Sequence, residues 1–172
     1  MTAANALTLI RAVLVLPVIW LIGVGDPRAA LVLFLLAAAT DALDGAVARR
    51  HEGASELGAA LDPLADKVLV LGALTALAVR GAVPWWALAA IGVREVLAIE
   101  IRARHTVAAT ADGKAKTVLQ VAAVAALLVA AAWPAAGVDA LAAGLLGAAL
   151  ALTLASGVRL LLRARQTRAH AA

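Results

Sequence analysis

The chain alternates between long apolar stretches and short polar breaks. Apolar windows of roughly 20 residues, about the length an α-helix needs to cross the hydrocarbon core of a bilayer, fall at about 7–25, 29–50, 59–80, 83–102, 116–135 and 138–161. Gly, Pro or charged residues mark the breaks, as in Gly25-Asp26-Pro27-Arg28. The pattern predicts an all-α polytopic integral membrane protein with six transmembrane helices. We expect residues 1–172 to form a single membrane domain.

The composition supports a membrane protein. Hydrophobic residues make up 65% of the chain and charged residues 15%, whereas soluble domains carry about 25% charged residues. There is no cysteine, which excludes disulfides and thiolate metal sites. No basic region precedes the first apolar stretch, so we expect that stretch to remain as a span. The net charge is +4, and without a soluble basic domain it indicates anionic lipid and phosphate substrates as partners, with no nucleic acid.

Basic residues are distributed unequally between the two sides of the predicted spans. Two of them, Arg28 and Arg80, fall on one side. Ten fall on the other side: Arg49, Arg50, Arg102, Arg104, Lys114, Lys116, Arg159, Arg163, Arg165 and Arg168. Because basic residues beside short loops stay in the cytosol, we expect a multi-pass protein of the inner (cytoplasmic) membrane with both termini cytosolic.

Four aspartates lie near the cytosolic ends of the second and third apolar windows. Asp41 and Asp44 are three residues apart, and Asp62 and Asp66 are four apart. Either spacing puts both members of a pair on one helix face. Ionisable residues within membrane helices are costly and indicate function. A short loop joins the two helices, so we expect the four carboxylates to converge just below the cytosolic surface.

Four converging carboxylates repel one another unless they hold protons or a cation neutralises them. Oxygen-only ligands, with no Cys or His on these helices, favour Mg²⁺ or Mn²⁺ over zinc. The alternative is a set of helix-end charges that reach for the membrane interface. For a single aspartate this explanation is as good as a metal site. It does not explain why two pairs of aspartates face each other.

The aspartates belong to a longer pattern, D-x2-D-G-x2-A-R-x8-G-x3-D-x3-D, which runs from Asp41 to Asp66. Its fixed residues are Asp41, Asp44, Gly45, Ala48, Arg49, Gly58, Asp62 and Asp66. This pattern resembles the signature of the CDP-alcohol phosphotransferase family at every fixed position. The six-span layout is also similar, so the resemblance covers essentially the whole chain. It implies a divalent-metal-dependent enzyme of phospholipid biosynthesis that transfers a phosphatidyl group from CDP-diacylglycerol to an alcohol and releases CMP.

The resemblance also implies roles for individual residues. Asp41, Asp44 and Asp62 would hold two metal ions, and Asp66 would complete the site and act as the catalytic general base. The cytidine diphosphate pocket would be lined by Gly45, Ala48, Arg49 and Gly58. The opening Asn5-Ala-Leu-Thr8 resembles the family's N-terminal stretch, where Asn and Thr approach the nucleotide. A helix N-cap is the alternative role for Asn5.

The acceptor alcohol is indicated by the second half of the chain. Arg94-Glu95 and Gly113-Lys114-Ala-Lys116-Thr117 resemble stretches of bacterial phosphatidylglycerophosphate synthases. Basic residues near the metal site suit an acceptor that carries its own phosphate, so Arg94, Lys114 and Lys116 are candidate ligands of glycerol 3-phosphate. The alternative is that both lysines are topology charges and that Arg94 pairs with Glu95 or Glu100.

Other functions stay open. The segment between Arg94 and Gly113 is shorter than we expect for that subgroup, and cardiolipin synthases and phosphatidylinositol phosphate synthases share the same signature. From another class, a cation- or proton-coupled transporter would use intramembrane carboxylates as a relay. It would need charges near the midplane, whereas these aspartates lie toward one face. The family resemblance also implies a possible homodimer, and the small residues Gly144 and Gly147 permit packing between protomers.

Overall fold

The computed structural model describes the backbone of residues 3–48, 56–104 and 111–169, and the side chains of residues 13–40, 67–101 and 115–162. Within these ranges the chain forms only helices. They are α1 (Ala3–Val24), α2 (Pro27–Ala48), α3 (Glu56–Val79), α4 (Trp85–Arg104), α5 (Ala111–Ala132) and α6 (Ala136–Ala169). The shortest has 20 residues, which at 1.5 Å per residue is about 30 Å, the thickness of a bilayer's hydrocarbon core. The prediction of an all-α fold with six helices is confirmed.

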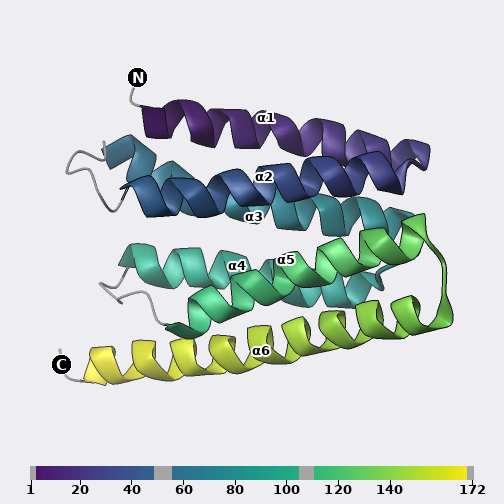
Figure 1. Ribbon diagram of the computed structural model, residues 1–172. Helices are drawn as coiled ribbons and strands as arrows, with labels where there is room; N and C mark the ends of the chain where they lie inside the picture. The colour runs from purple at the N-terminus through teal and green to yellow at the C-terminus, as the bar shows by residue number, and fades with distance from the viewer. Residues whose placement is uncertain (1–2, 49–55, 105–110, 170–172) are drawn as a thin grey trace.

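Successive helices run in opposite directions, as Figure 1 shows. Helices α1, α3 and α5 therefore begin, and α2, α4 and α6 end, at one end of the bundle, which we call the terminal end. The α1–α2, α3–α4 and α5–α6 connections lie at the other end, which we call the turn end (Figure 1). This alternation brings the helix ends that carry the predicted site residues to the terminal end.

Two glycines end helices at the turn end. Gly25 and Gly81 have φ values of 86° and 78°, a left-handed conformation that costs glycine little. After each one the next amide donates back into the helix, Asp26 N to Leu21 O at 2.9 Å and Ala82 N to Leu77 O at 2.9 Å. This is the hydrogen-bond pattern of a Schellman C-cap. Two residues are therefore enough to reverse the chain between α1 and α2.

The bundle is held by contacts of α1 with α2 and α3, of α5 with α6 and α2, and of α4 with α6 and α3. The largest fully buried side chains are Phe34, Leu74, Leu77, Ile91 and Leu128, on α2 to α5. Much of the remaining core is alanine. Because lipid tails are as apolar as leucine, helices in a bilayer associate through close van der Waals packing, which small residues allow.

Among the described glycines, Gly72 allows the closest approach of another helix. A Cβ atom added there would lie 2.9 Å from Val15 Cγ1 and 3.0 Å from Ile19 Cδ1 of α1. We expect Gly72→Leu to lower the free energy of unfolding by about 1–3 kcal/mol, the usual cost of overpacking a well-filled core. The measurement is the Tm of the detergent-solubilised protein. Gly92→Leu is the matched control, because a Cβ at Gly92 meets nothing within 4 Å. Equal Tm values for the two variants would contradict this account of the α1–α3 contact.

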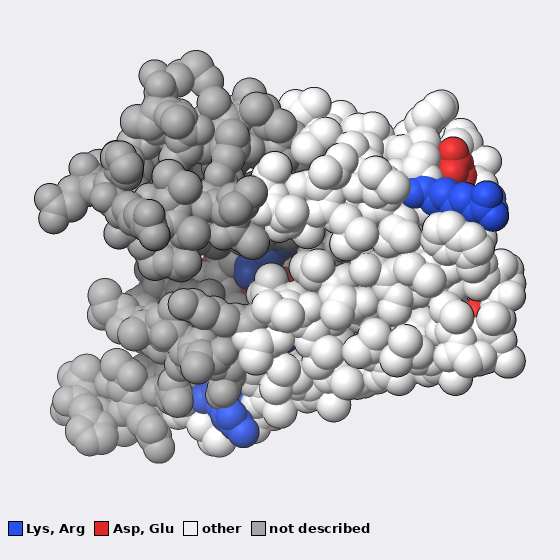
Figure 2. All heavy atoms as spheres, viewed as in Figure 1, with Lys and Arg blue, Asp and Glu red and all other residues white. Residues whose placement is uncertain are grey.

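The outer surface of the bundle is rich in large apolar side chains. Leu16, Trp20, Val79, Val96 and Leu141 are each at least 60% exposed, more than a monomeric soluble protein normally leaves in water. Figure 2 shows one face on which neutral atoms fill the region between the charged groups of the turn end and the terminal end.

Two helical segments are long and apolar enough to cross a membrane among the residues with described side chains. They are Ala115–Ala132 and Ala136–Leu162. Shorter apolar helical segments run over Val13–Val24, Pro27–Thr40 and Lys67–Val79. The six predicted helices are thus present, and two of them meet the criterion for a span within the described ranges.

Candidate active site

The four predicted metal-binding aspartates lie on the two helix segments that meet at the α2–α3 connection. Asp41 and Asp44 belong to the last turns of α2, and Asp62 and Asp66 to the first part of α3. Both segments are at the terminal end (Figure 1). The helices confirm the assumed i, i+3 and i, i+4 geometry of the backbone. The four side chains lie outside the described residues.

Five of the six residues predicted to bind the nucleotide fall at the same end of the bundle. Asn5 and Thr8 lie in the first turns of α1, Gly45 and Ala48 in the last turns of α2, and Gly58 in the first turn of α3. Arg49 lies outside the described residues, as do the side chains of Asn5 and Thr8. The structure therefore gathers the helix ends that carry these residues.

A buried carboxylate binds several cations toward the same end. Glu95 of α4 accepts a hydrogen bond at Oε1 from Lys116 Nζ of α5. Its Oε2 lies 2.8 Å from Lys67 Nζ of α3, and Oε1 also accepts from Arg94 NH1 at 3.3 Å. Lys67 directly follows Asp66 along α3. We call Lys67, Arg94, Glu95 and Lys116 the Glu95 cluster. It joins three helices next to the aspartate-bearing part of α3.

Arg94 extends the Glu95 cluster to α6. Its NH2 donates to Ser156 Oγ at 3.0 Å, and Ser156 in turn donates to Thr153 O at 2.9 Å. A Cβ at Gly157 would lie 3.2 Å from Arg94 Cγ, so the absence of a side chain at Gly157 lets the arginine pass close to α6. Arg94 Nε is buried and has no hydrogen-bond partner in the described part of the chain. One N–H donor thus stays available for an anion or water.

The charges of the Glu95 cluster do not balance. Three cations face one carboxylate, which leaves two positive charges in excess among the cluster's own residues. Lys116 and Arg94 are 3% and 9% exposed in their side chains, and Lys67 is 20% exposed. Buried charges are stabilised by groups of opposite charge. A dianionic ligand at this place would balance the two excess charges of the cluster.

The Glu95 cluster corrects part of the sequence-based interpretation. Lys116 is buried, unlike an ordinary topology charge, and Arg94 does pair with Glu95. Lys114 lies in the first turn of α5, but its side chain is outside the described residues. Sequence reasoning assigned no site role to Lys67, Glu95 or Ser156. For Lys67 the signal was a lysine directly after Asp66 within an apolar window.

The four aspartates of α2 and α3 fit a divalent metal. Asp41, Asp44, Asp62 and Asp66 supply carboxylate oxygens, the ligands that Mg²⁺ and Mn²⁺ prefer. Among the residues with described side chains, no three potential ligands gather into a metal-binding group.

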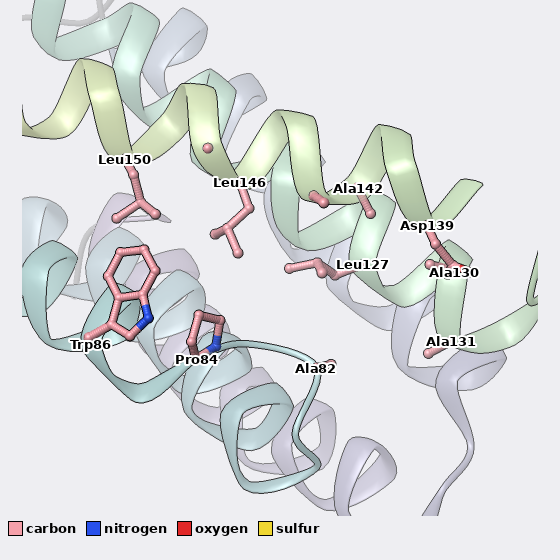
Figure 3. A pocket seen from close by; sticks show the side chains of 12 residues that line it. Ala82, Pro84, Trp86, Leu127, Ala130, Ala131, Asp139, Ala142, Leu146 and Leu150 are labelled. Atoms are coloured by element: carbon pink, nitrogen blue, oxygen red, sulfur yellow. The ribbon is translucent and has the colours of Figure 1, made fainter. Parts of the chain in front are cut away.

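A cavity of about 500 Å³ opens near the turn end between α4, α5 and α6. Figure 3 shows its apolar lining, with Trp86 and Pro84 on one side and Leu146 and Leu150 on the other. Asp139 is its one charged lining residue. The cavity lies away from the aspartates and the Glu95 cluster, so it is not a candidate for the chemistry.

Known proteins resemble this chain over most of its length. The family model for CDP-alcohol phosphatidyltransferase matches residues 1–155. A probable phosphatidylglycerophosphate synthase of Mycobacterium tuberculosis H37Rv is 37% identical over 172 residues, with 94% of this chain and 80% of the relative covered. The CDP-diacylglycerol–glycerol-3-phosphate 3-phosphatidyltransferases of Escherichia coli K12 and Yersinia enterocolitica are each 38% identical, with 71% of this chain and 74% of the relative covered.

These matches confirm the resemblance carried by the aspartate pattern. The family is membrane-bound and generally metal-dependent, and its members are transferases of phospholipid biosynthesis that use CDP-activated lipids. The chain described here belongs to the CDP-alcohol phosphatidyltransferase family.

Proposed function

We propose that this protein transfers the phosphatidyl group of CDP-diacylglycerol to glycerol 3-phosphate, forming phosphatidylglycerophosphate and releasing CMP. The observation that carries the proposal is the Glu95 cluster, whose two excess positive charges lie beside the aspartate-bearing helix. A phosphate dianion on the acceptor matches that charge. The relatives at 37–38% identity bear names for the same reaction.

Asp41, Asp44, Asp62 and Asp66 would hold two Mg²⁺ or Mn²⁺ ions. When bound, such ions neutralise the diphosphate and the charge that develops on the departing CMP. Gly45, Ala48 and Gly58, which lack bulky side chains, would leave room for cytidine diphosphate at the terminal end. Arg49, Asn5 and Thr8 would supply its polar contacts. Phosphoryl transfer depends mainly on such positioning and charge neutralisation.

In the reaction, the acceptor's hydroxyl oxygen forms a bond to the phosphorus that carries the diacylglycerol. The bond from that phosphorus to the CMP oxygen breaks, and the hydroxyl proton passes to Asp66 as general base. Arg94, Lys116 and Lys114 would bind the acceptor's own phosphate through charge-assisted hydrogen bonds. That contact would hold the hydroxyl near Asp66, which precedes Lys67 on α3.

We further propose that all six helices cross the inner (cytoplasmic) membrane, with both termini and the active site at the cytosolic face. Each helix is long enough. Four exposed tryptophans lie at the turn end: Trp20, Trp85 and Trp86 are in the last or first turns of helices, and Trp133 directly follows the end of α5. Tryptophans collect at membrane interfaces, and Arg28 lies over the Trp133 ring at 5.2 Å. A homodimer would be compatible with this layout, because a Cβ at Gly144 or Gly147 meets nothing within 4 Å.

The proposed reaction is tested by an acceptor screen. The purified protein is given CDP-diacylglycerol and Mg²⁺ or Mn²⁺, and CMP release is measured with glycerol 3-phosphate, phosphatidylglycerol or inositol phosphate. We expect release with glycerol 3-phosphate. Release with phosphatidylglycerol alone would indicate a cardiolipin synthase, and release with inositol phosphate alone a phosphatidylinositol phosphate synthase. No release with any alcohol would contradict the assignment as a transferase and favour the transporter.

The variant Asp66→Asn distinguishes a role of Asp66 as general base from a role as metal ligand. We expect Asp66→Asn to lose turnover, because an amide cannot accept the hydroxyl proton. It should retain CDP-lipid binding better than Asp41→Asn does, because the amide oxygen can still bind a metal ion. Single-turnover CMP release and binding of a non-reactive CDP analogue measure the two effects. Equal loss of nucleotide binding in both variants would show that Asp66 acts mainly as a ligand.

A further inference from the structure

Among the residues with described side chains, Glu95 is the one anion that all three cations of the Glu95 cluster share. Lys116 of α5 donates to its Oε1, Arg94 of α4 donates to the same oxygen, and Lys67 of α3 approaches its Oε2. The carboxylate is 4% exposed. Three helices are thus connected through a single buried side chain.

Glu95 also crosses a space that the backbones leave open. Over their described residues α4 and α5 make no close backbone contact, and each packs instead against α6 and α3. Backbone packing therefore does not determine where the Lys116 ammonium points relative to α4. The hydrogen bond to Glu95 does, and the ion pair at Oε2 directs Lys67 toward the same place.

We propose that Glu95 is a positioning residue for the acceptor: it holds Lys67 and Lys116 so that their remaining N–H donors, with Arg94 Nε, form the binding site for the acceptor's phosphate group. This inference rests on the proposed function. Each ammonium has three donors, so a lysine that bonds to Glu95 keeps donors for a phosphate. The unpartnered Arg94 Nε adds a further donor from α4.

If Glu95 positions the lysines, neutralising it should weaken phosphate binding, whereas the change in net charge alone would strengthen it. Removing the Glu95 charge makes the cluster more positive, which by itself would strengthen phosphate binding. However, three cations without a shared anion repel one another, and the two lysines then point apart. Phosphate binding that depends on directed, charge-assisted donors is weakened as a result.

The test compares Glu95→Gln and Glu95→Asp with the wild type in detergent micelles that contain CDP-diacylglycerol. For each protein we measure kcat, the KM of glycerol 3-phosphate, the KM of the CDP-lipid, and the inhibition constant of inorganic phosphate against glycerol 3-phosphate. Glu100→Gln is the control, because it makes the same change at an exposed position of α4.

We expect Glu95→Gln to raise the KM of glycerol 3-phosphate and the inhibition constant of inorganic phosphate together, by at least about tenfold. The KM of the CDP-lipid and kcat at saturating acceptor should change by less than about threefold, and Glu95→Asp, which keeps the charge, should lie between Glu95→Gln and the wild type. Glu100→Gln should behave as the wild type.

Three results for Glu95→Gln would overturn the proposal. The KM of glycerol 3-phosphate could fall, or it could equal the wild-type value. Alternatively, kcat could fall together with the binding of both substrates. If Glu95→Gln does not accumulate in the membrane, Glu95→Asp decides the question through the same two KM values. A wild type that releases no CMP with glycerol 3-phosphate refutes the proposed function itself. An active wild type without the KM difference refutes only the role of Glu95.

Discussion

Asp41→Asn, Asp44→Asn and Asp62→Asn should each lower the rate of CMP release by at least about 100-fold, the order of loss when one charge-stabilising group is removed from an active site. The reason is the charge of the site. Each carboxylate contributes a full negative charge to bound cations, and an amide oxygen in its place contributes none. The measurement is CMP release at saturating CDP-diacylglycerol and glycerol 3-phosphate.

The same metal site predicts dependence on a free divalent cation. Excess chelator should abolish CMP release, and added Mg²⁺ or Mn²⁺ should restore it in the wild type but not in Asp41→Asn. Glu100→Gln is the matched control, since it neutralises an exposed carboxylate of α4 outside the aspartate pattern. Full activity of the wild type in excess chelator would show that the aspartates do not act through a metal.

Lys116→Met should raise the KM of glycerol 3-phosphate by about 10- to 100-fold, because a hydrogen bond to a charged group contributes about 1.5–3 kcal/mol. Methionine keeps a similar unbranched length and removes only the ammonium that bonds to Glu95. The KM of the CDP-lipid should remain within about twofold of the wild-type value, since the nucleotide is expected at other helix ends. Initial rates over a range of acceptor concentrations measure both constants.

The control for Lys116→Met is Arg80→Met, which removes one positive charge at the turn end, where Arg80 is exposed and donates to Gly23 O at 3.5 Å. It should leave both KM values unchanged. If Lys116→Met instead lowers membrane insertion and total activity and leaves both KM values unchanged, Lys116 acts only in setting the membrane topology.

Much of the fold could be predicted from the sequence because the relevant signals are local. Windows of apolar residues gave boundaries within a few residues of α1 to α5, and Gly25 and Gly81 marked the turns that end α1 and α3. The end of α6 was the main difference: we expected a span to residue 161, and the helix continues to Ala169. The polar segment after Leu162 consists mostly of Arg and Ala, which are good helix formers, so it extends the helix beyond the apolar stretch.

The candidate site was predictable in part for the same reason. The aspartates and glycines of the pattern are close in sequence and lie on two helices joined by a short connection, so spacing alone predicted that they share one end of the bundle. Arg94 and Lys116 were found only as basic residues near that end. Their common partner Glu95 is 21 residues from Lys116 and 28 from Lys67 along the chain.

The sequence by itself therefore determined the all-helical class, the family and the end of the bundle at which the aspartate-bearing helix ends lie. These follow from the length of the apolar windows and from residue spacing in the aspartate pattern. Only the tertiary structure decided that Lys67, Arg94 and Lys116 meet at Glu95 and that Ser156 of α6 accepts a hydrogen bond from Arg94. It also decided that α4 and α5 make no close backbone contact over their described residues. Such contacts depend on how helices far apart in the chain pack and rotate against one another, and local periodicity carries no information about that rotation.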